Sequence, residues 1–470
     1  MIKKINNLNF PLAIFSIFSI FSILISLGHI DRWVVSEQVA MAENFIINNS
    51  FFPSPDQESI KGVSVYPPGL AIFSLVLLKL GLENYIFEIL LASSILFIFI
   101  FFLIYKFLYQ EIFNYKVNND DFLIYIILIT TLLPRWYDYS LQLKPSILGQ
   151  IFGLTVLLLF IKNKKKNMII YSFFLGFLYS LPIIFKQQYI AFIIGFTLFC
   201  LFSRSLKSIF FCLGSFLSLT ILLTTLNLEN LQYWNYEIFK DDGTTDLLII
   251  FSEHYLVLLR MIFLVGFSLL AGFKFSEKIK VNINYIKQKC AENPIYFVSV
   301  SSFFAIYLGL YKAGGNDGNI EGGLIFLVPL FFYIFQNLNI RYLILFAFIS
   351  VFSLLPKVYY SVQDYVNMNE FKERVEILDI PSDIKIVIDS NTYYASRVIE
   401  TKDSVDNYWS YSYTIPGRGS PNLESYIKDK LDDQKFVLII ESTELNRSLV
   451  TTLGLNLIFE NNSGIIAFSK

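Results

Sequence analysis

HIDRWVVSEQVAMAENFIINNSFFPSPDQESIKGVSVYPPGLAIFSLVLLKLGL, residues 29–82, is the first polar stretch after an apolar N-terminal run. Asp31 lies where a first membrane span would end. An amphipathic segment comes next, and then YPPG at 66–69 opens an apolar piece, 68–80, that is too short to cross a bilayer. We interpret this stretch as the roof of an active site at the membrane surface, supported by the rest of the chain.

The composition indicates a polytopic membrane protein. Of 470 residues, 55% are hydrophobic and 16% are charged, whereas soluble proteins carry about 25% charged residues. The net charge of -1 provides no general attraction to nucleic acid, so a nucleic-acid partner is not expected. Three cysteines and two histidines predict neither a disulfide framework nor a metal centre. A divalent cation held by other ligands stays open.

The distribution of basic residues gives the topology, because short loops rich in Lys and Arg stay in the cytoplasm. The basic short loops, above all KNKKK at 162–166, all fall inside only if 68–80 does not cross. The N-terminus is then cytoplasmic and the C-terminus extracytoplasmic, in the cytoplasmic (inner) membrane of a cell. We expect about eleven spans, at about 10–28, 85–107, 122–140, 146–161, 168–185, 189–203, 208–226, 255–273, 295–311, 324–336 and 341–356.

From Val358 onward the charges become more frequent and the long apolar runs stop. The sequence predicts buried strands at 383–390 and 436–442, a helix ending at Gly454, and a terminal hairpin over 455–470. We therefore predict a transmembrane module over 1–357, with an outer loop at 29–84, and a small α/β domain over 358–470 on the outer face.

Several basic side chains lie where the positive-inside rule does not call for them. They map to outer loops or to the outer ends of spans: Arg32, Arg135, Lys144, Lys186, Arg260 and Lys312. Ionisable groups near the membrane are costly and are functional candidates by default. Each one alone is equally well explained by snorkelling to lipid headgroups. Together they indicate an anion at the outer surface, and a phosphate on a lipid carrier fits.

Asp31 is the complementary acidic group. Glycosyl transfer needs a base that deprotonates the acceptor hydroxyl, and a positioned carboxylate can do this. Displacement in one step would invert the anomeric carbon. The alternative is that Asp31 only marks the water boundary or caps the helix that follows.

That helix has apolar residues at Val35, Val39, Ala42 and Ile46, a spacing typical of a helix on the bilayer surface. Its polar residues would then face water or substrate, and they are Glu37, Gln38 and Glu43. A second outer loop, 227–254, carries Trp234 and other aromatic residues. They are candidates for an acceptor site, and an aromatic belt at the interface is the other interpretation.

The order of these motifs resembles the GT-C glycosyltransferases that use lipid-linked sugars, namely the protein O-mannosyltransferase and aminoarabinose-transferase-like group. The matching elements are Asp31 after the first span, Ala40 to Asn49, YPPGL at 66–70, KLG at 79–81, KQ at 186–187 and the Gly-rich segment 314–323. Two positions depart from the pattern. Arg32 stands where the family often has a second acidic residue. The segment KPS at 144–146 matches a family motif that ends in an acidic residue, and Ser146 takes the place of that residue. Nearby Asp138 is the candidate substitute for it.

The resemblance implies a GT-C-like fold and an integral-membrane glycosyltransferase. Its donor would be a polyprenyl-phosphate-linked sugar, and its acceptor a glycan, lipid or protein at the extracytoplasmic face. Asp31 would be the catalytic base, and Tyr66 would shape the sugar pocket together with Glu37, Asp138 and Trp234. The donor phosphate would be bound by Arg135, Lys144, Lys186, Arg260 and Lys312. The alternative is a transporter or flippase of lipid-linked sugars, but such proteins usually contain inverted repeats, which are not evident here.

Overall fold

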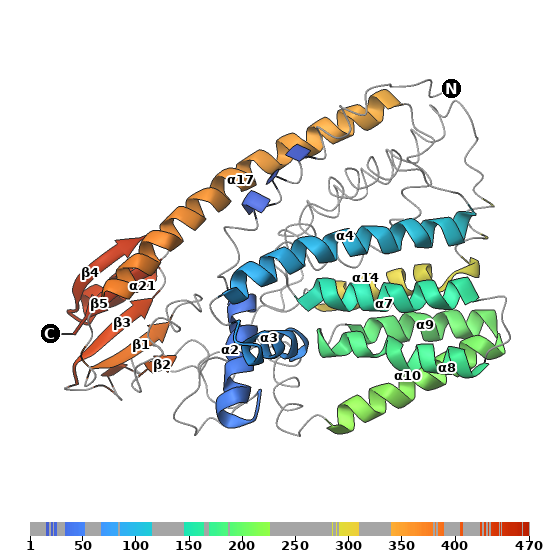
Figure 1. Cartoon of the computed structure of the whole chain (residues 1–470), viewed down its shortest axis with the longest axis horizontal. Coiled ribbons are helices and arrows are strands. Elements are labelled where there is room, and N and C mark those ends of the chain that lie inside the picture. Colours follow the sequence, from blue (N-terminus) through green and yellow to red (C-terminus); the bar gives the residue numbers. More distant parts are fainter. Residues whose placement is uncertain are drawn as a thin grey trace. The chain divides into compact units, whose positions relative to one another are not determined.

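The computed structural model describes residues 16–17, 20–21, 23–25, 33–51, 67–82, 85–114, 145–163, 169–186, 189–225, 284, 288, 291–309, 340–378, 381, 384–389, 405–407, 424, 427–428, 431, 434–440, 442, 444–462 and 464–469. Sequence predictions for all other residues lie outside the described part. The chain divides into two units (Figure 1), the first formed by Met1–Ile23, Ala92–Thr225 and Asp241–Lys357, the second by Leu24–Leu91, Leu226–Lys240 and Val358–Lys470.

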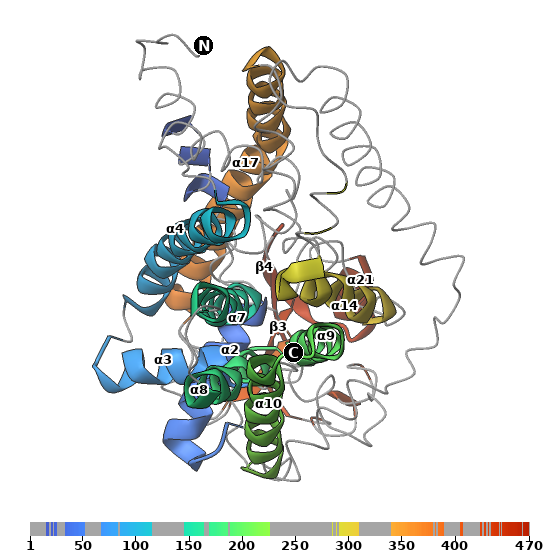
Figure 2. The same cartoon turned by 90° about the vertical axis from the view of Figure 1, so that its right-hand side faces the viewer.

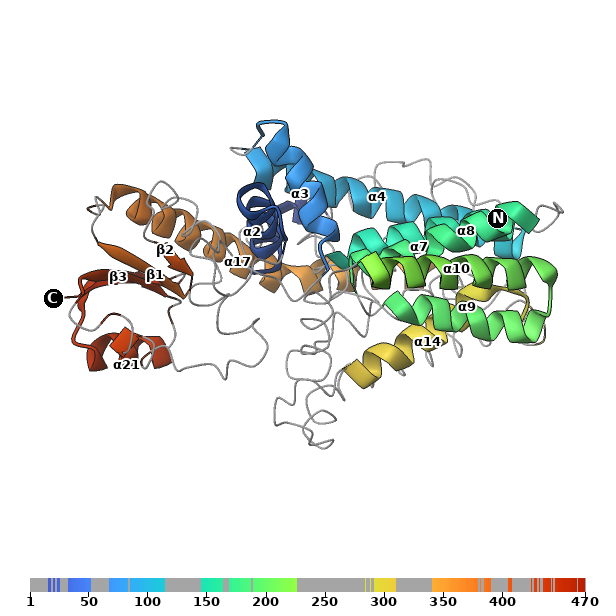
Figure 3. The same ribbon diagram turned by 90° about the horizontal axis from the view of Figure 1, so that it is seen from below.

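Most helices of the first unit lie side by side in a bundle (Figure 3), and several of them are seen close to end-on in Figure 2. Its described helices are most of α4 (Ile86–Phe113), then α7 (Pro145–Lys162), α8 (Ile169–Tyr179), η3 (Leu181–Ile184), α9 (Ile190–Ser203), α10 (Leu206–Thr225), α14 (Pro294–Gly309) and the first part of α17 (Ile340–Ile377). These bounds follow the predicted spans closely except for α17, which continues to Ile377 although a span was predicted only at 341–356. The span predicted at 168–185 also differs, because it is α8 followed by a 3-10 turn.

Proline causes that change. Pro182 has no backbone N–H to donate to the preceding turn, and its ring clashes with the carbonyl four residues earlier. The α-helix therefore ends at Tyr179, and the chain continues as the 3-10 helix η3, with the Ile183 N–H donating to the Ser180 carbonyl at 3.1 Å. A tight turn of this kind lets the chain reverse direction into α9.

Small residues bring α8 and α10 into close contact. A Cβ on Gly176 would lie 1.9 Å from the Phe211 carbonyl oxygen, and one on Gly214 would lie 2.1 Å from that of Phe173. The Ser215 hydroxyl donates to the Gly176 carbonyl at 2.9 Å across the same interface. Helices in lipid associate through such close backbone approach and interhelical hydrogen bonds, because lipid provides no hydrophobic driving force between them.

Two of the described helices are long and apolar enough to cross a membrane, Ala92–Phe113 and Leu206–Thr224. Four others are apolar but shorter, namely Gly69–Lys79, Ile147–Lys162, Ile169–Ile184 and Ile190–Ser203. The predicted short piece at 68–80 is confirmed as a helix of 11 residues, α3 (Gly69–Lys79). At 1.5 Å per residue it is about 16 Å long, well short of a bilayer core. The count of eleven spans stays a prediction.

The second unit contains α2 (Trp33–Asn48), α3 and a five-stranded sheet. The strands are β1 (Lys385–Asp389), β2 (Val405–Asn407), β3 (Phe436–Ile440), β4 (Asn456–Asn461) and β5 (Gly464–Phe468), in the order β2-β1-β3-β5-β4. β1 pairs in parallel with β2 and β3, whereas β5 is antiparallel to β3 and β4. The predicted strands and the terminal hairpin are thus confirmed.

Helices cover both faces of this sheet (Figure 3). Phe371 and Val375, near the end of α17, pack on one face with Ile386 and Ile439. The other face packs against residues of α21 (Glu444–Thr452), and Gly454 ends this helix with a φ of +62°. α17 is continuous past Pro356, so the chain has no break at 356–358, where the sequence predicts the end of a span. The division into domains at 357 stays a prediction.

Candidate functional site

The structure describes only part of the predicted site. Lys186 is described in full, and Glu37 lies in α2, where only its backbone is described. The remaining predicted residues lie outside the described part of the chain: Asp31, Arg32, Tyr66, Arg135, Asp138, Lys144, Trp234, Arg260 and Lys312. The structure therefore describes two parts of the predicted site: the turn that holds Lys186 and the contact between α2 and α3.

Lys186 lies in the turn between η3 and α9, and hydrogen bonds fix its backbone on both sides. Its N–H donates to the Pro182 carbonyl at 3.3 Å, and its carbonyl accepts from the Tyr189 N–H at 3.0 Å. The sequence therefore sets the position of this lysine through the proline that converts the end of α8 into a 3-10 turn. This confirms the predicted turn between the two helices.

The side chain of Lys186 is buried, with 6% of its surface exposed. Burial penalises the charged ammonium and lowers the pKa of Lys186 from 10.5 to about 8. A buried lysine at the end of a membrane helix is costly and is usually retained for function. The burial of Lys186 therefore supports the prediction, made from the sequence, that this residue is functional.

The first turns of α7 pack against the Lys186 turn. A Cβ on Gly149 would lie 2.3 Å from the Tyr189 ring, and one on Gly153 would lie 2.6 Å from the Phe192 ring. The beginning of α7 and the Lys186 turn therefore lie at the same end of the bundle. α7 starts at Pro145, and Lys144, which precedes it in sequence, lies outside the described residues, so its place in the site stays a prediction.

α2 and α3 are joined by a buried amide. Gln38 of α2 is fully buried, and its Oε1 accepts a hydrogen bond from the Ala71 N–H at 3.0 Å. Ala71 lies in the first turn of α3, where backbone N–H groups have no partner within the helix. The side chain of one helix thus caps the next. This contact holds the first turn of α3 against α2.

The prediction of which α2 side chains are exposed is wrong in part. Gln38 was expected to face water or substrate and is buried. Val39 and Ala42 were expected to face the bilayer but are buried within the protein, as are Ala40 and Met41, whereas Ile46 is 52% exposed, as a side chain facing the bilayer would be. Side chains on more than one face of α2 are covered by the rest of the protein. A single apolar stripe therefore does not predict which residues of this helix are buried.

Sequence reasoning also missed Gln150, a buried amide in the second turn of α7. The available signal was an isolated amide in an otherwise apolar helix. Among the described residues, no group of three or more His, Cys, Asp or Glu side chains is placed to hold a metal ion.

Comparison with protein-family models and with curated proteins gives no match. Among solved structures, the chain is similar to ArnT from Cupriavidus metallidurans bound to undecaprenyl phosphate, with a TM-score of 0.57 and 10% sequence identity over 97% of this chain and 98% of that one. The apo state of that protein gives a TM-score of 0.54 and 10% identity over 97% of both chains. The likeness shows the fold. The sequence resemblance to the aminoarabinose-transferase-like group predicts this fold over nearly the whole chain.

Proposed function

We propose that the protein is an integral-membrane glycosyltransferase. It moves a sugar from a polyprenyl-phosphate-linked donor to an acceptor at the extracytoplasmic face of the cytoplasmic membrane. The observation that carries this proposal is the fold likeness, over 97% of the chain, to a protein whose structure holds undecaprenyl phosphate. The motif order of the first 200 residues, from Asp31 to the Lys186 turn, supports the same conclusion.

The chemistry is a single displacement. The oxygen of the acceptor hydroxyl forms a bond to the anomeric carbon of the sugar, and the bond from that carbon to the donor phosphate oxygen breaks. Asp31 takes the hydroxyl proton, and polyprenyl phosphate leaves with the electron pair of the broken bond. Attack opposite the leaving group inverts the anomeric carbon.

Lys186 contributes to departure of the phosphate. An ammonium group that is largely removed from water interacts more strongly with a phosphate oxygen than one in solvent does. Negative charge on the bridging oxygen grows as the bond breaks, so a fixed cation lowers the barrier. Lys144, Arg135, Arg260 and Lys312 are proposed to bind the same phosphate. Tyr66, Glu37, Asp138 and Trp234 are proposed to line the sugar and acceptor pocket.

The experiment is transfer of radiolabelled sugar from a panel of polyprenyl-phosphate donors by the purified, lipid-reconstituted chain. Transfer to an acceptor, or slow hydrolysis of one donor, supports the proposal. The same vesicles test the alternative, because a flippase moves the labelled donor between leaflets and leaves it intact. Movement of intact donor without transfer or hydrolysis over the whole panel would overturn the enzyme assignment.

A further inference from the structure

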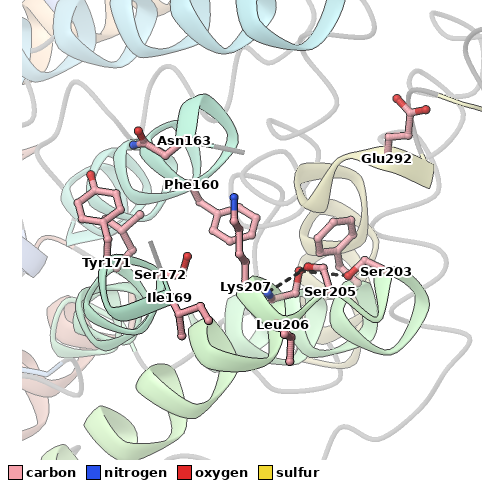
Figure 4. Close-up of a pocket in the computed structure, with 13 residues that line it drawn as sticks. Phe160, Asn163, Ile169, Tyr171, Ser172, Ser203, Ser205, Leu206, Lys207 and Glu292 are labelled. Atoms are coloured by element: carbon pink, nitrogen blue, oxygen red, sulfur yellow. Dashed lines mark hydrogen bonds between the residues drawn. The ribbon is translucent and has the colours of Figure 1, made fainter. Parts of the chain in front are cut away.

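The bundle contains a cavity of about 740 Å³ where α7 and α9 end and α8 and α10 begin (Figure 4). Serine hydroxyls on its wall bond to one another, since the Ser203 hydroxyl donates to that of Ser208 at 3.1 Å and the Ser205 hydroxyl lies 2.7 Å from it. Lys207, on the same wall, is half-buried and has an interaction within the protein. These polar groups therefore do not indicate a ligand. The exposed face of α17 is more informative.

One face of α17 is apolar and exposed over about three turns. Leu355, Tyr359, Val362 and Val366 follow one another at spacings of four, three and four residues, which places them on one face of the helix. Tyr365 adjoins Val362 one turn further on. These five side chains, which we call the tyrosine stripe, are between 38% and 60% exposed.

The stripe ends at Val366. The same series of positions continues with Glu370 and Glu373, which are exposed and charged. Carboxylates are costly to hold against acyl chains. The exposed face of α17 therefore changes from a surface suited to lipid to one suited to water between Val366 and Glu370.

The tyrosines of this face are arranged as they are at a membrane–water interface, where amphipathic rings collect. The Tyr359 hydroxyl accepts a hydrogen bond from Gln363 Nε2 at 2.7 Å, so its polar end is directed toward the later, charged turns of the helix. The ring of Tyr360 meets that of Tyr359 edge-on, with centroids 5.6 Å apart. Apolar rings whose hydroxyls reach toward water suit the headgroup layer.

The sheet packs on α17 just beyond the stripe (Figure 1). Phe371 and Val375 contact it from the face opposite to the stripe. Asn461, at the end of β4, donates from its Nδ2 to the Asn367 carbonyl at 2.7 Å. The stripe and the sheet therefore occupy successive parts of one helix, and the sheet begins at the residue after Val366.

The length of α17 fits a lipid contact at the stripe. The span predicted at 341–356 is about 24 Å long at 1.5 Å per residue, which falls short of a hydrocarbon core of about 30 Å. The helix from 341 to Val366 is about 39 Å long, which matches that core plus one headgroup layer of about 7 Å. A lipid surface thus explains why the apolar face ends at Val366, whereas a protein partner does not.

We propose that the tyrosine stripe lies in the headgroup layer of the leaflet nearest the sheet, which the topology predicts to be the outer one. α17 then leaves the lipid near Val366, about three turns beyond the end of the predicted span. The end of β4, which bonds to Asn367, lies at the membrane surface, so the sheet is held next to the lipid by its own helix. The proposal does not depend on the proposed enzymatic activity, because only the membrane fold and α17 enter it.

The test compares how strongly oxygen and a water-soluble nickel chelate relax a nitroxide on α17, by electron paramagnetic resonance of the full chain in liposomes of phosphatidylglycerol and phosphatidylethanolamine. Oxygen concentrates in lipid, and the chelate stays in water. The label is attached at Val362→Cys or, as the matched control on the same face, at Glu373→Cys. The native cysteines are first replaced by alanine, namely Cys200, Cys212 and Cys290.

Oxygen should relax the label at 362 more than the chelate does, and this order should reverse at 373, about 16 Å further along the helix. Stronger relaxation by the chelate at both positions would overturn the proposal. A second copy of the chain on the stripe would bring two labels together. Spin–spin broadening at 362 that disappears on dilution with unlabelled chain would therefore assign the stripe to a dimer and also overturn the lipid assignment.

If the chain without its native cysteines does not fold, the wild type is tested instead. It is reconstituted with a phosphatidylethanolamine that carries a photoreactive diazirine on its headgroup. Adducts within 359–366 support the proposal, and adducts confined to other segments contradict it.

Discussion

Lys186 is the predicted site residue whose surroundings the structure describes most fully. The lysine-glutamine pair between two apolar helices predicts a turn at this place, and the hydrogen bonds of the turn confirm it. Its burial was not predictable from the local sequence, because burial depends on which helices pack against the turn, as α7 does where Gly149 contacts the Tyr189 ring. A buried amine with a pKa of about 8 loses its charge just above physiological pH.

This pKa predicts opposite responses of activity and stability to pH. Below about pH 8 the ammonium is charged and can bind the donor phosphate, so kcat/KM for the donor should fall about tenfold per pH unit above pH 8. The folded pKa is lower than the unfolded one. The unfolded chain therefore holds more protons between about pH 8 and 10.5, and the ligand-free protein should become more stable as pH rises through that window.

The measurement is kcat/KM and melting temperature from pH 7 to 10 for wild type, Lys186→Gln and the exposed control Lys428→Gln. Lys186→Gln should be slow at every pH, and its melting temperature should rise less across the window than that of wild type. Lys428→Gln should follow wild type in both. A wild-type kcat/KM that stays level to pH 10 would contradict the assignment of Lys186 to the donor phosphate.

At the scale of elements, the contact between α8 and α10 determines the packing of the bundle. Gly176→Leu places side-chain atoms where the Phe211 carbonyl lies, so the helices must separate. We expect a loss of about 3 kcal/mol in unfolding free energy, as for overpacking in a core. Thermal unfolding of the purified protein checks this. Phe174→Leu on an exposed position of the same helix is the control, and equal melting temperatures for the two variants would contradict the packing account.

The Gln38–Ala71 hydrogen bond is a second contact between elements. In Gln38→Leu the new side chain is similar in size, but the buried Ala71 N–H loses its acceptor. An unsatisfied buried N–H costs about 1–3 kcal/mol of folding free energy. The expected result is faster amide exchange at 69–72, a lower kcat and a lower melting temperature than that of the control. Ile47→Leu, on an exposed position of α2, is the matched control. Unchanged exchange at 69–72 in Gln38→Leu would show that the bond does not hold α3.

Most described helices begin and end close to the residues predicted from the sequence. The reason is that the length of an apolar run determines which residues form a helix in a membrane protein. The faces of α2 were not predictable, since the polar Gln38 is buried by a partner helix instead of facing water. The continuity of α17 was also missed. Pro356 removes one backbone hydrogen bond, but the long helix tolerates it. Local patterns predict elements well, and contacts between elements decide which side chains are covered.

For the chain as a whole, the order of motifs predicted the fold of aminoarabinose-transferase-like proteins, and the likeness to ArnT over 97% of this chain shows that fold. The predicted roof of the site is described only at α2 and α3. The roles assigned to Asp31, to Tyr66 and to the basic residues outside the described part of the chain therefore rest on the sequence.

The most direct test of this account is the rate of sugar transfer from a polyprenyl-phosphate donor by wild type, Asp31→Asn and Glu444→Gln. Glu444 is an exposed carboxylate on α21 and serves as the control. We expect Asp31→Asn to bind donor as wild type does but to transfer at least about a hundredfold more slowly, the usual contribution of a general base. Glu444→Gln should transfer normally. Equal transfer by wild type and Asp31→Asn would contradict the assignment of the base.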